Sequence, residues 1–240
     1  MMTFEQLYDG YSKSLNNAER LLSAGLKLFG EYSEIALGLF ELGQEELGKS
    51  FTFLAAFVFS NTSVAEDFLF KNWRKHPVKV HRAFLYELIS PLRVVIEDGK
   101  GNILSGGSVR EKFHHEKEAS FYVNYDKKQK RFVEPQETVQ TVEVGNRGGT
   151  LLCLINTALC VKKALDDDED IEANYKLFSD LAQRLLCLEI YQQDMPAVFE
   201  AFAKQSPQHA RIVDNLVKIL PKAEENSLRK GDNHFNDDRL

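Results

Sequence analysis

The sequence predicts an all-α protein built as a helical bundle. Apolar residues recur every three or four positions over 4–28, 32–59 and 136–165, which is the spacing of one helix face. The stretch 119–133 instead combines aromatic and β-branched residues, which predicts either a small β-hairpin or two extended segments. The 240 residues are 43% hydrophobic and 28% charged, a composition typical of a globular protein with a substantial core.

The helix predicted over 32–59 is apolar around most of its circumference, so we expect it to lie at the centre of the bundle. Residues 61–63 are N-cap candidates for a third helix that runs to Trp73. Pro77 either kinks that helix or occupies the first turn of a new one. An inward apolar stripe then continues to Leu92.

The C-terminal half returns to a helical pattern at 136–165, where Gly145, Gly148 and Gly149 are expected to break or bend the helix. Five consecutive acids at 166–170 predict a solvated linker or a helix start, with further helices beyond. We therefore predict three regions: a helical domain over 1–165, a C-terminal helical extension over 166–222 and a polar, flexible tail over 223–240.

The net charge of −6 does not indicate general nucleic-acid binding, so any such surface must be local. The segment 71–82 contains five Lys or Arg residues, two His and no acid, and a second basic cluster lies at 127–131 beside aromatic residues. Such patches suit an RNA backbone, with bases stacked on the aromatic rings. A solvated helix face and a charged turn explain them equally well.

The longest uncharged run, 50–65, is shorter than the roughly 20 apolar residues that span a membrane. The first residues lack the basic and apolar regions of a signal peptide. The three cysteines form no CxxC pair and leave one cysteine over in any disulfide scheme, as is typical of a reducing compartment. We expect a cytoplasmic protein with no membrane contact.

Charged residues interrupt the most hydrophobic helix. Helical spacing puts Glu41, Glu45 and Thr52 on the more polar stripe and predicts that Glu46 points inward, while Glu45 is the more exposed partner of Lys49. The inward stripe consists of Leu39, Leu42, Glu46, Lys49, Phe53 and Ala56. Ordinary ion pairing on a helix surface accounts for the same spacing, but a charge inside a core helix needs a partner.

Several motifs together resemble the AbiV family of bacterial abortive-infection proteins, which belongs to the all-helical HEPN superfamily. The most specific is Glu45-Glu46-Leu47-Gly48-Lys49; the others are Ala36-Leu37, Trp73, His76-x-x-Lys79, Arg110, the string 121–125 and Pro135. The resemblance covers about 4–165 and implies an HEPN-like bundle, with functional residues at Glu45, Glu46, Lys49, His76, Lys79, Arg110 and Tyr122. This chain holds extra residues between Arg110 and Tyr122, including His114 and His115.

Many HEPN proteins are metal-independent ribonucleases that use an Arg and a His separated by four to six residues. His exchanges protons near neutral pH, and Arg holds the phosphate and stabilises developing charge. Eleven Arg and six His give roughly 0.8 such pairs by chance. This chain has three: Arg74 with His81, Arg110 with His115, and Arg229 with His234. A basic helix end and a core histidine remain alternative interpretations of His115 and His81.

The resemblance and the chemistry together predict a phage-defence protein that acts on RNA, with two copies forming a homodimer. The expected catalytic residues are His76, Arg110, His115 and Glu46. The expected binding residues are Glu45, Lys49, Lys79, Arg74, His81 and Tyr122. The alternative is a non-enzymatic protein that senses or binds a phage protein, a translation component or a nucleotide. The sequence lacks HExxH, phosphate-loop and dinucleotide motifs, so we expect no metal and no cofactor.

Overall fold

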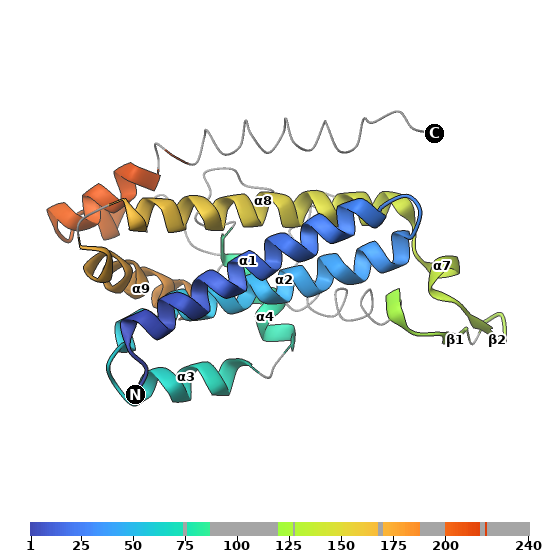
Figure 1. The fold of residues 1–240 in the computed structure, drawn as a ribbon, viewed down its shortest axis with the longest axis horizontal. Coiled ribbons are helices and arrows are strands. Elements are labelled where there is room, and N and C mark those ends of the chain that lie inside the picture. The colour runs from blue at the N-terminus through green and yellow to red at the C-terminus, as the bar shows by residue number, and fades with distance from the viewer. Residues whose placement is uncertain are drawn as a thin grey trace.

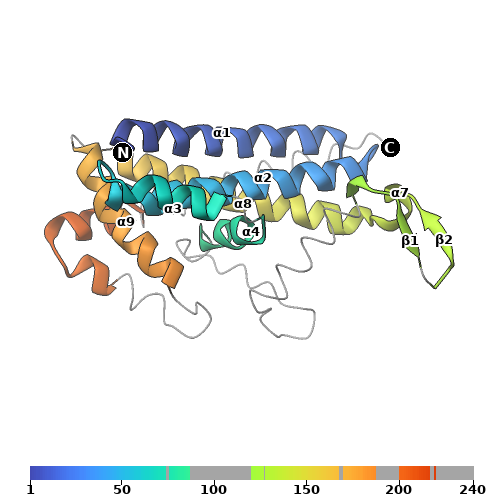
Figure 2. The ribbon, with the colours of Figure 1, turned by 90° about the horizontal axis from the view of Figure 1, so that it is seen from below.

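The computed structural model describes residues 1–73, 76–86, 120–126, 128–167, 170–187, 200–216 and 219. Within these residues the protein is a helical bundle with one small hairpin, so the predicted all-α class is confirmed (Figure 1). Three long helices lie side by side: α1 (Phe4–Leu28), α2 (Ser33–Ala56) and α8 (Thr141–Asp166). Two shorter helices, α3 (Val64–Trp73) and α4 (His76–Ala83), pack on α2 (Figure 2).

The first two helices begin and end close to the predicted positions. Thr3 and Gln6 form a capping box at the start of α1: the Thr3 hydroxyl accepts from Gln6 N at 3.3 Å, and the Gln6 side chain accepts from Thr3 N at 2.9 Å. Gly30, with φ +95°, turns the chain into α2. A 3₁₀ turn, η1 (Phe57–Phe59), extends α2 to the end of the predicted range.

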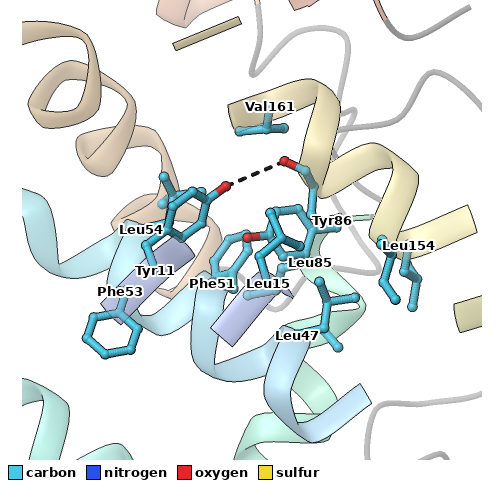
Figure 3. Packing of buried hydrophobic residues seen from close by; sticks show 14 of the residues in the cluster. Tyr11, Leu15, Leu47, Phe51, Phe53, Leu54, Leu85, Tyr86, Leu154 and Val161 are labelled. Atoms are coloured by element: carbon cyan, nitrogen blue, oxygen red, sulfur yellow. Dashed lines mark hydrogen bonds between the residues drawn. The ribbon is translucent and has the colours of Figure 1, made fainter. Parts of the chain in front are cut away.

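The core surrounds α2, as its apolar circumference predicts. Side chains from α1, α2 and α8 interdigitate in the close view, where Tyr11, Phe51 and Leu154 represent the three helices (Figure 3). Two buried polar contacts cross this core. The Tyr11 hydroxyl lies 3.5 Å from the carbonyl oxygen of Ala158, and the Ser50 and Tyr86 hydroxyls are 2.9 Å apart. The buried hydroxyl groups of Tyr11, Ser50 and Tyr86 therefore have partners.

The predicted helix over 136–165 divides into α7 (Pro135–Thr138) and α8. The break lies at Val139 and Gln140, whose backbones are extended, and the expectation of a break at the glycines is wrong. A Cβ atom at Gly148 would lie 2.9 Å from the ring of Phe40, so this glycine lets α8 approach α2 closely instead of interrupting the helix.

By length and hydropathy alone, α8 is long and apolar enough to cross a membrane. In the bundle, however, 56% of its most apolar segment is buried inside the protein. The helix packs against α1, α2 and α9, which is the environment expected of a core helix.

The predicted hairpin is present. Strand β1 (Asn124–Asp126) pairs with β2 (Arg131–Val133) in antiparallel register, with Tyr125 opposite Phe132. Figures 1 and 2 both place the hairpin beyond one end of the long helices, while α9 (Ile171–Cys187) lies at the other end.

The acidic run includes the end of α8 and the residue before α9. Asp166 is the last residue of α8, and the Asp170 carboxylate accepts a hydrogen bond from Ala173 N at 3.0 Å at the start of α9. Tyr175 and Phe178 of α9 are fully buried in the same core as α1 and α2. Residues 200–203 and 207–216 are also helical. The division into three regions stays a prediction, and the predicted tail over 223–240 lies outside the described residues.

Candidate functional site

One side of α2 carries polar side chains that are nearly inaccessible to solvent. The exposed fractions are 1% for Glu41, 5% for Glu45 and 6% for Thr52. These residues are spaced four and seven positions apart, so they lie along one stripe of the helix. Two carboxylates at such depth require cationic partners, because an unpaired buried charge costs several kcal/mol.

The helix α4 brings two cations to this stripe because it crosses α2 at very short range. A Cβ atom built at Gly48 would lie 1.7 Å from the carbonyl oxygen of Lys79. Only a glycine at this position allows the α4 backbone to reach the α2 surface. The contact places Lys79 and Arg82, one helical turn apart, over the polar stripe.

Three cations meet the stripe. Lys79 Nζ lies 2.9 Å from Glu45 Oε2, and an Arg82 guanidinium nitrogen donates to Thr52 Oγ1 at 2.9 Å. Arg147 of α8 brings its Nε within 3.1 Å of Glu41 Oε1. We call this group the charged interface: Glu41, Glu45 and Thr52 of α2, Lys79 and Arg82 of α4, and Arg147 of α8.

Arg82 shows the electrostatic cost of this arrangement. Burial lowers the pKa of its guanidinium to about 10, because the charged form loses its hydration. The guanidinium carbon also lies 5.8 Å from the centre of the Phe68 ring, at the range of a cation–π contact. A strongly perturbed cation beside two buried ion pairs is a feature that often marks a functional site.

The predicted burial of the two adjacent glutamates is wrong. Glu45 is buried and pairs with Lys79, whereas Glu46 is only partly buried and pairs with Lys49 on the same helix. The side chains of Glu46 and Lys49 keep 18% and 22% of their accessible surface. The reason is the position of α4, which covers the Glu45 side of α2 and supplies a cation there.

Gln44 is a further buried polar residue beside this interface. Its exposed fraction is 1%, and neither its amide oxygen nor its amide nitrogen has a hydrogen-bond partner among the residues that the structure describes. Gln44 lies one turn from Glu41 and from Gly48 on α2. Sequence reasoning missed Gln44, Arg82 and Arg147 as site residues, although the 41, 44, 45, 48, 52 spacing shows the stripe.

The remaining predicted site residues fall into two groups. His76 and His81 belong to α4, the helix that also carries Lys79, but their side chains lie outside what the structure describes. Tyr122 is 64% exposed, precedes β1 and takes no part in the charged interface. Arg74, Arg110 and His115 lie outside the described residues. The structure therefore brings together Glu45 with Lys79 and Glu46 with Lys49.

Within the described ranges, no group of three or more His, Cys, Asp or Glu side chains is arranged to hold a metal ion. The charged interface instead offers carboxylates matched one to one with cations. Its described groups could position a phosphate or move a proton. They suit the stabilisation of charge more than the coordination of a metal.

The architecture and the charged interface define an all-helical bundle protein whose candidate site lies between its central helix and a short crossing helix. A family model named HEPN_AbiV and described as AbiV matches residues 6–144, more than half of the chain. The protein belongs to the AbiV family of the HEPN class, which indicates a role in abortive infection, a form of phage defence. No curated protein and no solved structure matches the chain. The matched region ends three residues before Arg147.

Proposed function

We propose that this phage-defence protein acts on RNA in the cytoplasm as a metal-independent ribonuclease. The observation that carries the proposal is the fixed position of α4. Lys79 and Arg82 both contact buried groups of α2, and the backbone touches α2 at Gly48. Buried ion pairs are not the most favourable way to hold two helices together, since apolar side chains of similar size do so at least as well. The presence of buried charged contacts beneath α4, the helix that carries His76 and His81, supports a catalytic role for that helix.

The proposed reaction is attack of an RNA 2′-oxygen on the adjacent phosphorus. A base removes the 2′-hydroxyl proton, the bond from phosphorus to the 5′-oxygen breaks, and an acid protonates that leaving oxygen. His76 of α4 is the proposed proton carrier, with His115 as the second. Arg110 stabilises the charge that develops on the phosphate. Lys79 positions α4 through its pair with Glu45, and Glu46 with Lys49 supports the site. The products are a 2′,3′-cyclic phosphate and a 5′-hydroxyl end.

The test is incubation of purified protein with total RNA and with tRNA, in the presence of a metal chelator. Cleavage with 2′,3′-cyclic phosphate ends is the expected result, and His76→Ala lowers the rate by about 10²-fold or more, since a positioned acid or base contributes that much. His115→Ala should lower the rate as well, because His115 is the second proposed proton carrier, and His81→Ala shows whether the other histidine of α4 takes part. Cleavage that none of the three changes affects would exclude the proposed chemistry.

A second candidate function is binding without cleavage, as a sensor of a phage protein, a translation component or a nucleotide. The observation that favours it is that Lys79, Arg82 and Arg147 already contact protein groups. If the native protein cleaves no RNA at all, this second function is favoured over the first. The proposed homodimer is measured in the same preparations by light scattering.

A further inference from the structure

The β-hairpin presents one face to the protein and the other to solvent. Val133 is 7% exposed, whereas its neighbour Phe132 is 71% exposed, as the alternation of a strand requires. Tyr122 and Val123, which lead into β1, are 64% and 59% exposed. A single exposed apolar side chain is common, but three of them on and beside one short hairpin call for an explanation.

The base of the hairpin is held firmly against the bundle. A Cβ atom at Gly38 of α2 would lie 2.1 Å from the ring of Phe121, so that ring rests directly on the α2 backbone. Within β2, Arg131 Nη1 lies 2.7 Å from Glu137 Oε2 of α7, the helix that follows the hairpin. The two anchors fix the hairpin at the end of the bundle, where Figures 1 and 2 show it extending away from the long helices.

The turn of the hairpin carries positive charge. Lys128 and Lys130 are exposed and form no ion pair with any residue that the structure describes. The nearby acid, Asp126, is engaged by the turn itself, because its carboxylate accepts from Lys128 N at 2.7 Å and from Gln129 N at 3.0 Å. Its charge is therefore directed at the backbone of the turn.

Lys130 also occupies an unfavourable backbone conformation. Its φ is +52°, a left-handed region where glycine or asparagine is the usual residue and where other residues cost about 1 kcal/mol or more. Backbone strain of this kind often occurs at functional sites, so the strained residue is a candidate for a functional role. Here the Lys130 side chain adds a cation at the tip of the hairpin.

We propose that the hairpin is an arm that binds single-stranded RNA. Lys128 and Lys130 contact phosphates, while Phe132 and Tyr122 stack on unpaired bases. Single strands are the substrate class because duplex RNA keeps its bases stacked inside the helix and offers side chains mainly phosphate and ribose. The inference rests on the proposed function, because it names how the substrate of the ribonuclease is held.

The test measures binding of a short fluorescent single-stranded oligonucleotide with 2′-O-methyl groups, which cannot be cleaved, beside a duplex of the same sequence. Lys128→Gln with Lys130→Gln reduces the slope of log K against log salt by about 1.4, because each phosphate contact on a single strand contributes about 0.7. The matched control is Lys13→Gln with Lys204→Gln, which removes the same charge from side chains that are 75% and 72% exposed. This control leaves the slope unchanged.

Stacking is tested separately at Phe132. Both Phe132→Ala and Phe132→Leu raise the dissociation constant by about fivefold or more, since leucine keeps apolar area but lacks the aromatic face. Full binding by Phe132→Leu would overturn the stacking contact. If the Phe132 variants change the molar mass measured by light scattering and leave RNA binding unchanged, the hairpin surface binds a second copy of the protein. That result would also overturn the proposal.

Parallel cleavage assays separate the two proposals. If the native protein cleaves RNA and the lysine and Phe132 variants bind the oligonucleotide as well as native protein does, the hairpin inference falls and the ribonuclease stands. If the native protein neither binds nor cleaves any RNA, the proposed function is wrong, and the hairpin inference that rests on it is wrong as well. Weaker binding by the variants, with native cleavage, supports both.

Discussion

Two groups of charged side chains fasten helices to this bundle, and they differ in depth. In the charged interface, the side chains of Lys79 and Glu45 keep 7% and 6% of their accessible surface. The second group, which we call the Asp166 cluster, joins Tyr8 of α1, Lys162 and Asp166 of α8, and Tyr175 of α9. There the side chains of Lys162 and Asp166 keep 23% and 28%.

The Asp166 cluster is built mainly from hydrogen bonds to one carboxylate. The Tyr8 and Tyr175 hydroxyls each donate to Asp166 at 3.0 Å, and Lys162 pairs with Asp166 and lies 2.6 Å from the Tyr8 hydroxyl. Asp166 therefore has three partners, and both Lys162 and Asp166 keep some access to water. In the charged interface, Lys79 and Glu45 have little access to water, so the loss of one partner cannot be compensated by hydration. Depth, more than the number of contacts, should decide how each group responds to substitution.

Lys79→Met should give the largest effect, because it leaves the Glu45 carboxylate buried without its cation. We expect a loss of about 3–5 kcal/mol in the free energy of unfolding, measured by urea denaturation. The double variant Glu45→Leu with Lys79→Met removes both charges and should recover most of this loss. A double variant as unstable as Lys79→Met alone would show that packing, and not the unpaired charge, dominates the charged interface.

Gly48→Ala tests the close approach of α4 without changing any charge. The new methyl group would overlap the carbonyl oxygen of Lys79, so α4 must move away from α2. We expect a loss of about 3 kcal/mol, at the upper end for an overpacked core. Gly149→Ala is the matched control, since a Cβ atom there meets no atom within 4 Å. Equal stability of the two variants would contradict the short contact between α2 and α4.

Alkaline pH should weaken the folded protein through its buried tyrosines, one of which, Tyr175, belongs to the Asp166 cluster. Burial raises the pKa of Tyr11, Tyr86 and Tyr175, so the folded protein keeps three protons that the unfolded chain releases above pH 10. The stability that these three tyrosines contribute is therefore fully present below pH 10 and decreases as the pH rises above 10. Arg82 acts with the opposite sign, because its folded pKa of about 10 is below the unfolded value and the unfolded chain holds more protons there.

The opposing effects of three tyrosines and one arginine predict that the free energy of unfolding decreases by about 2 kcal/mol between pH 10 and 11. Urea denaturation at closely spaced pH values measures it. Tyr175→Phe removes one of the three tyrosines. The part of the slope of stability against pH that the tyrosines cause should therefore decrease by about a third. A slope that Tyr175→Phe leaves unchanged would assign the alkaline loss to other groups.

The sequence predicted the helices well because their information is local. The period of apolar residues places α1 and α2 within a few residues of their observed ends. The orientation of Glu45 and Glu46 could not be predicted in the same way, because helical spacing does not show which neighbour will cover each side. The cation that buries Glu45 comes from α4, and Arg147 comes from a helix far along the chain.

The hairpin illustrates the same limit. Aromatic and β-branched residues predicted strands, but only the structure shows that Phe121 rests on Gly38 and that Phe132 faces solvent. The glycines of α8 were misjudged for a related reason. Glycine both interrupts helices and permits close contacts, and the sequence alone does not say which property is in use at Gly148.

The smallest effect is expected for Lys162→Ala in the Asp166 cluster. Burial opposes the charge of Lys162, yet its bonds to Asp166 and Tyr8 raise its pKa overall, so the amine is a favourable partner. Water reaches this pair, however, and Asp166 keeps the two tyrosine hydroxyls when the lysine is lost. We therefore expect a loss below about 1 kcal/mol, reduced further by added salt. A loss as large as that of Lys79→Met would mean that connectivity, and not depth, sets the strength of charged contacts in this bundle.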